Sequence, residues 1–102
     1  MAVIELNANN FDEIVINATK PVLIDFWASW CGPCKMLSPL VEQIAEERDD
    51  IIVASINVDE EPELSLQFNI RSIPTLIVFK NGEIANQSIG FIPKEKILAL
   101  VE

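Results

Sequence analysis

The chain has 102 residues, half of them hydrophobic, which is enough for one domain with its own core and too few for two. A formal charge of −9 disfavours nucleic acid and anionic lipid as partners over most of the surface. Two cysteines are too few for a secreted scaffold that depends on disulfides, and with no histidine they cannot complete a structural zinc site.

The first third of the chain predicts a strand, a short helix and a second strand. Residues 2–6 alternate in polarity, which predicts a short strand. Asn9 or Asn10 can cap a helix that extends to about residue 17. Residues 22–28 are nearly all apolar, which is typical of a central strand covered on both faces.

The middle of the chain predicts a long helix, a strand and a short helix. The long helix begins near the cysteines and runs to about residue 48. Its inward stripe is expected to comprise Met36, Leu37, Leu40, Val41, Ile44 and Ala45. Residues 51–58 form another apolar strand, and a helix over residues 62–68 follows the proline that opens it.

The last third predicts two strands and a helix. Residues 75–80 and 83–89 flank Asn81-Gly82, a strong hairpin signal, and residues 93–101 have helical spacing. Strands separated by helices pair in parallel through right-handed crossovers, whereas the hairpin adds an antiparallel pair. The expected fold class is therefore α/β, with a mixed central sheet and helices on both of its faces.

Both cysteines lie in one segment, Trp30-Cys31-Gly32-Pro33-Cys34, where a strand gives way to a helix. Residues three apart at a helix start lie on one side of it, close enough for a disulfide after a small tightening that Gly32 permits. Pro33 suits a first helical turn. Free N–H groups at the helix start, together with Lys35, lower the pKa of the first thiol. Cys31 is thus the expected nucleophile near the surface, and Cys34 the more buried resolving thiol.

Three other interpretations of the cysteine pair are possible. Half a zinc site would need two further ligands, and the chain has no other cysteine or histidine to supply them. A static disulfide would close so short a loop that it would stabilise little. Two inert buried thiols are the third alternative, which an exposed Cys31 would exclude.

The sequence closely resembles the thioredoxin family along essentially its whole length. The matching segments are DFWASWCGPCKM at 25–36, Pro39, NVD at 57–59, RSIPT at 71–75, FKNG at 79–82 and Gly90. The resemblance implies a single thioredoxin domain over residues 1–102, with a five-stranded mixed sheet flanked by four helices. It implies reduction of protein disulfides, with Cys31 attacking, Cys34 releasing the product, and a thioredoxin reductase restoring the dithiol.

Other residues are candidates for supporting roles. Asp25 lies in an apolar strand, where burial raises the pKa of a carboxyl group, and we expect it to accept the proton of Cys34. The family often has lysine where this chain has Ser55, so the charge environment of Asp25 is an open question. The family also has a cis proline at Pro74, facing the dithiol. The expected substrate-docking residues are Trp30, Ile73, Pro74, Gly90 and Phe91.

Two further functions are possible for such a chain. The first is an oxidase or isomerase on the same fold, but the Gly32-Pro33 pair between the thiols argues against it. The second is a binding module in which the thiols are incidental. We expect a monomer with no bound cofactor or metal, acting on disulfide-containing proteins, and no nucleic acid or membrane partner. No secretion signal or apolar run long enough to span a bilayer is apparent, which predicts the cytoplasm, or an organelle stroma after loss of a transit segment.

Overall fold

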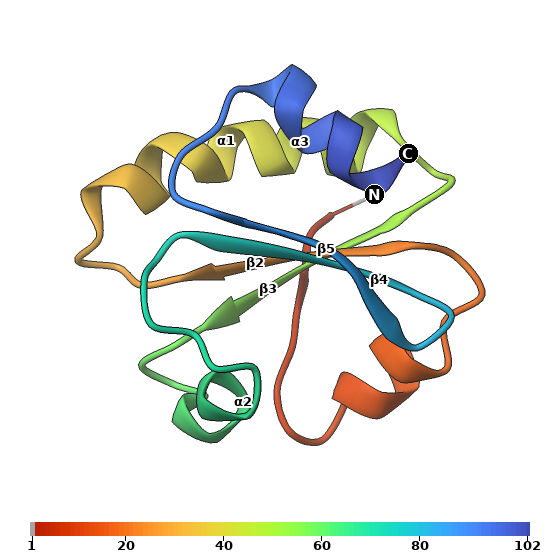
Figure 1. The fold of residues 1–102 in the computed structure, drawn as a ribbon, viewed down its shortest axis with the longest axis horizontal. Coiled ribbons are helices and arrows are strands. Elements are labelled where there is room, and N and C mark those ends of the chain that lie inside the picture. Colours follow the sequence, from red (N-terminus) through yellow and green to blue (C-terminus); the bar gives the residue numbers. More distant parts are fainter. Residues whose placement is uncertain (1) are drawn as a thin grey trace.

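The structure, a computed structural model, describes residues 2–102, and within them one sheet is covered by helices (Figure 1). Its strands are β1 (Ile4–Glu5), β2 (Val22–Trp27), β3 (Ile52–Asn57), β4 (Thr75–Lys80) and β5 (Glu83–Ile89). Its helical segments are η1 (Asp12–Ile16), α1 (Gly32–Glu47), α2 (Pro62–Gln67) and α3 (Lys94–Val101). The predicted order of elements is confirmed, and most bounds differ from the predicted ones by one or two residues.

The strands lie in the order β1-β3-β2-β4-β5. β3 pairs in parallel with both β1 and β2, whereas β4 is antiparallel to β2 and to β5. Asn81 and Gly82 both have positive φ, 55° and 78°, as a two-residue hairpin turn between β4 and β5 requires. A Cβ at Gly82 would also lie 3.0 Å from the Ile16 carbonyl oxygen, so both the positive φ and the lack of space favour glycine at this position. The mixed sheet predicted from the sequence is confirmed.

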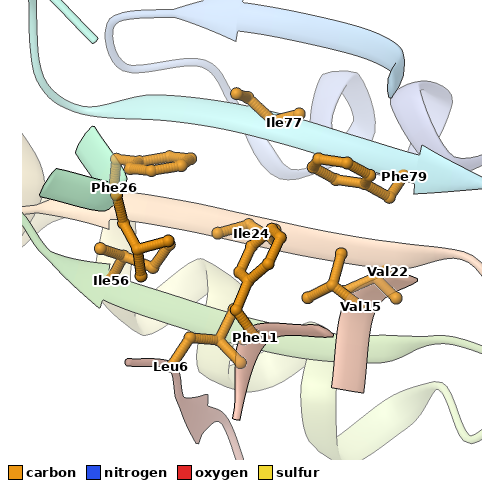
Figure 2. Packing of buried hydrophobic residues seen from close by; sticks show 11 residues of the cluster. Leu6, Phe11, Val15, Val22, Ile24, Phe26, Ile56, Ile77 and Phe79 are labelled. Atoms are coloured by element: carbon orange, nitrogen blue, oxygen red, sulfur yellow. The ribbon is translucent and has the colours of Figure 1, made fainter. Parts of the chain in front are cut away.

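The alternation of side chains along β2 assigns each residue to one face of the sheet. Val22, Ile24 and Phe26 pack in the cluster that contains Phe11 and Val15 beside η1 (Figure 2). Leu23 instead belongs to a second cluster, formed largely with α1 and α3. By the same alternation Asp25 faces α1, the helix that contains Cys34 and is capped by Cys31.

Two local predictions were wrong. Neither Asn9 nor Asn10 caps the first helix, because the Asn7 side-chain oxygen accepts the N–H groups of both and forms a turn that delays the helix. The segment that follows is a π-helical turn, η1, without a side-chain cap. Met36 does not belong to the buried face of α1, because it is 63% exposed, although the next residue, Leu37, is buried.

Candidate functional site

The two cysteines meet where β2 ends and α1 begins. Cys31 is the N-cap residue of α1, and its Sγ accepts the N–H of Cys34 at 3.2 Å. The two residues are joined by a disulfide, with their Cα atoms 5.3 Å apart. The first turn of α1 contains Lys35, which is exposed, and no acidic residue. Once the disulfide is reduced, this environment stabilises a thiolate on Cys31, since a helix N-terminus and a nearby cation both favour negative charge.

The exposure of the pair corrects one expectation. Cys31 is only 5% exposed, not a surface residue, because Ala28 and the partly buried Trp27, Val58 and Ile73 pack around the pair. It is nevertheless more accessible than Cys34, which is 1% exposed. The order of accessibility is therefore the predicted one.

The loop before β4 lies directly beside the dithiol. The peptide bond between Ile73 and Pro74 is cis, and the Ile73 carbonyl oxygen lies 3.8 Å from Cys31 Sγ. The Gly90 N–H donates to the Pro74 carbonyl oxygen at 2.8 Å, which ties the end of β5 to this loop. Phe91 follows Gly90 along the chain and is 42% exposed. Residues 73, 74 and 90 thus lie together beside the dithiol. Phe91 is placed near them as the residue that follows Gly90.

Trp30 has a partner that the sequence analysis missed. Its indole Nε1–H donates to Asp59 Oδ2 at 2.8 Å, although the side chain of Trp30 is 68% exposed. Asp59 follows β3, whose last residue, Asn57, pairs with Trp27 at the end of β2. The carboxyl ends of two parallel neighbouring strands meet at one edge of a sheet. This rule could have predicted from the sequence that Trp30 and Asp59 lie close together.

Asp25 is buried on the α1 side of the sheet. It is 2% exposed, and within residues 2–102 its Oδ1 has no hydrogen-bond partner. Burial raises the pKa of Asp25 from its ordinary 3.8 to about 7, as predicted in direction. Ser55, at the position where the family often has lysine, is the neighbour of Asp25 on β3. Burial is the cause of the raised pKa, and Ser55 carries no charge that would offset it.

Asp25 lines a hollow of about 210 Å³. Ser38 and Glu42 of α1, Ser55 of β3 and Trp27 of β2 are also in its wall. Across residues 2–102, no three acidic, cysteine or histidine side chains come together as metal ligands. None of the helices in this part of the chain has the length and hydropathy to cross a membrane.

Comparison with known proteins gives a consistent result. The family model described as Thioredoxin matches residues 2–102. The chain is 52% identical to a thioredoxin of Alicyclobacillus acidocaldarius subsp. acidocaldarius, over 96% of this chain and 93% of that protein. It is 44% identical to a thioredoxin of Staphylococcus haemolyticus, over 100% of this chain and 97% of that one. A chloroplastic M-type thioredoxin of Spinacia oleracea is 43% identical, over 96% and 55% of the two chains.

Proposed function

Because the chain belongs to the thioredoxin family, we propose that in the cell it reduces disulfide bonds of other proteins. The chain is an oxidoreductase, and it carries out dithiol–disulfide exchange through Cys31 and Cys34. The observation that carries the exchange chemistry is the position of Cys31 at the start of α1, where the Cys34 N–H reaches its sulfur, and the proposed direction follows from the family. The thiolate is the nucleophile of the exchange, so its stabilisation on Cys31 makes the attacking group available, whereas the direction of exchange is set by the reduction potential of the pair.

The proposed cycle balances in two displacements. The Cys31 thiolate attacks one sulfur of the target disulfide, forms a mixed disulfide and releases the other target sulfur as a thiolate, which takes up a proton. The Cys34 thiol then loses its proton, and its sulfur attacks Cys31 Sγ. This second step closes the Cys31–Cys34 disulfide and releases the second target thiolate, so two electrons pass to the target.

Asp25 is the proposed acceptor of the Cys34 proton. It lies on the face of the sheet that α1 covers, and its pKa of about 7 suits proton transfer near neutral pH. A carboxylate with an ordinary pKa would be a weaker base for a thiol. Asp25 is buried, so its carboxyl group is out of reach of a target, and its proposed effect is on the second displacement.

The proposed docking surface for the target consists of Trp30, Ile73, Pro74, Gly90 and Phe91. Trp30 and Phe91 are exposed, and the cis Ile73–Pro74 segment borders Cys31. The bend at Gly90, with φ of 91°, leaves open space where a Cβ would stand, so a target backbone has room to approach. Gly32, Pro33 and Lys35 support the site by forming the first turn of α1.

Replacing Phe91 by alanine is expected to raise the KM for a protein disulfide such as insulin by about tenfold, because burial of an aromatic side chain is lost. The kcat should stay within about twofold, and a small aromatic disulfide should be reduced as before. Ile84→Ala is the matched control: Ile84 is also an exposed apolar residue, 52% accessible, but it lies at the other end of β5. An equal effect of the two variants on insulin would remove Phe91 from the docking surface.

The chain is proposed to act as a single-domain monomer without a cofactor of its own, in the cytoplasm or in an organelle stroma. Its oxidised form then needs an external donor, for which we propose a thioredoxin reductase. This follows from the family, and the Cys31–Cys34 disulfide is the group that the reductase would reduce.

The function is tested by coupled reduction of insulin with a thioredoxin reductase and its electron supply, together with the reduction potential of the Cys31–Cys34 pair. We expect sustained turnover, and a potential well below the about −180 mV of a disulfide isomerase. A potential at or above that value would instead support an oxidase or isomerase. Full biological function of a Cys31→Ser/Cys34→Ser double variant would support a binding module.

A further inference from the structure

The loop before β4 ends on a buried hydroxyl group that no step of the proposed cycle uses. Thr75 is the first residue of β4, it is 2% exposed, and its Oγ1 donates to the Ser72 carbonyl oxygen at 2.5 Å. Its neighbours across the sheet are Phe26 on β2 and Ile89 on β5. Because strands on both sides hold the Thr75 backbone, its hydroxyl group is a fixed anchor for the exposed Ser72.

This hydrogen bond fixes the direction of the next N–H group along the chain. A trans peptide unit is planar, and its C=O and N–H groups point to opposite sides. The Ser72 carbonyl and the Ile73 N–H share one such unit, since the one cis bond found in residues 2–102 joins Ile73 to Pro74. With the carbonyl held by Thr75, the Ile73 N–H points away from that hydroxyl group.

Ile73 is left with a backbone donor that the chain itself does not pair. Within the described residues, 2–102, its N–H donates to no acceptor, although the residue is half-buried. The carbonyls of its two neighbours, Ser72 and Pro74, are both engaged in hydrogen bonds. Its own carbonyl oxygen lies 3.8 Å from Cys31 Sγ. A half-buried N–H without a partner is costly, and a target backbone bound beside Cys31 can satisfy it.

We propose that Thr75 is a positioning residue for target binding, and that its hydroxyl group holds the Ser72–Ile73 peptide so that the Ile73 N–H donates to a backbone carbonyl of the target. Thr75 is buried, so it acts through Ile73 and touches neither the target nor a reacting sulfur. The ligand is an extended protein segment, because backbone pairing requires a peptide carbonyl. The inference rests on the proposed docking surface, to which it adds the residue that orients one donor.

The test compares Thr75→Val with Thr75→Ser. Valine keeps the branched shape and loses only the hydroxyl group, whereas serine keeps the hydroxyl group. With valine, the KM for insulin should rise about fivefold, the effect of one lost hydrogen bond, while kcat stays within about twofold. With serine, the KM should remain near that of the native chain. A small aromatic disulfide, which has no peptide carbonyl, should be reduced equally well by all three proteins.

Ser65→Ala is the control for the loss of a buried hydroxyl group as such. Ser65 is 8% exposed and donates to the Glu61 carbonyl oxygen at 3.0 Å, but it lies on α2, outside the docking surface. Urea unfolding should show comparable losses of stability for Ser65→Ala and Thr75→Val, since each leaves one backbone carbonyl without its donor. Only Thr75→Val should change the KM, whereas a merely structural threonine would lower stability and leave the KM unchanged.

A measurement without any change at Thr75 follows the Ile73 amide directly. Cys34→Ser lacks the releasing thiol, so it retains a target peptide as a mixed disulfide on Cys31. Hydrogen exchange of the Ile73 N–H, observed by NMR, should be at least about tenfold slower in that complex than in the same variant before reaction. An amide that exchanges at one rate in both states would overturn the proposal, even if Thr75→Val did not fold.

Two further results separate the possible failures. If Thr75→Val and Thr75→Ser have the same KM while both turn over insulin, the role of Thr75 is wrong and the proposed disulfide reduction stands. If the native chain itself does not sustain insulin reduction with a reductase, the proposed function fails, and the role of Thr75 fails with it.

Discussion

Replacing Cys31 by serine is expected to lower the rate of disulfide reduction by at least about a thousandfold, because a hydroxyl at this position does not ionise near neutral pH and cannot displace sulfur. Insulin reduction by the pre-reduced variant measures the loss. Cys34 is left with a thiol in that variant, but it is 1% exposed and cannot reach a target disulfide.

Cys34→Ser is the matched variant, and its expected result is different in kind. Cys31 still attacks, but no second thiol releases the target, so a covalent complex accumulates in place of product. Mass spectrometry of the variant after reaction with a protein disulfide should show one target joined through Cys31, and dithiothreitol should release it. A complex formed by Cys31→Ser instead would reverse the assigned roles of the two cysteines.

Replacing Asp25 by asparagine is expected to stabilise the oxidised protein at neutral and alkaline pH. The pKa of Asp25 is about 7 in the folded chain and near 3.8 in the unfolded chain. Between these values the folded state holds a proton that the unfolded state has lost, so stability falls as pH rises and the loss is complete above about pH 7. The full loss is about 4 kcal/mol, and asparagine, which does not titrate, removes it.

The measurement is urea unfolding of the native and Asp25→Asn proteins at several pH values. The two should have similar stability below about pH 4 and diverge up to about pH 8, with asparagine more stable. Asp12→Asn, which changes an exposed carboxylate on η1, is the control for the loss of one negative charge. A constant difference between the native protein and Asp25→Asn across this range would show that the folded carboxyl group titrates normally.

The same variant should slow disulfide reduction by about a hundredfold at neutral pH, the lower end of what general base catalysis contributes. The effect should fall on the second displacement, so mixed disulfide should accumulate transiently in quenched samples. Equal rates for Asp25→Asn and Asp12→Asn would remove Asp25 from the mechanism. A more stable but slower protein is the combination that a functional buried carboxyl group predicts.

The parts of the fold that the sequence predicted well depend on local signals. The apolar run that became β2 could only be a covered strand, and Asn81-Gly82 fixed the hairpin because both residues tolerate positive φ. The placement of Cys31 at the start of α1 followed from a strand, a Gly-Pro pair and a helical stripe in succession. Each of these signals lies within about ten residues of the feature that it predicts.

The parts that were missed depend on contacts between distant segments. The Asn7 side chain accepts the N–H groups of Asn9 and Asn10, which takes the place of the predicted caps. This asparagine-rich stretch allows several such turns, and local patterns do not distinguish them. Cys31 is buried because Ile73, 42 positions later, packs against it. The hydrogen bond between Trp30 and Asp59 joins residues 29 positions apart that follow two neighbouring strands, so it depends on the pairing of those strands.

The surroundings of Cys31 Sγ restrict the line along which a disulfide can meet it. One side of the sulfur is occupied by the Cys34 N–H at 3.2 Å and another by the Ile73 carbonyl oxygen at 3.8 Å. Displacement at sulfur requires the attacking, central and leaving atoms to be nearly collinear. We therefore expect these two neighbours to restrict the approach, so that disulfides on exposed loops react faster than those enclosed in a folded core.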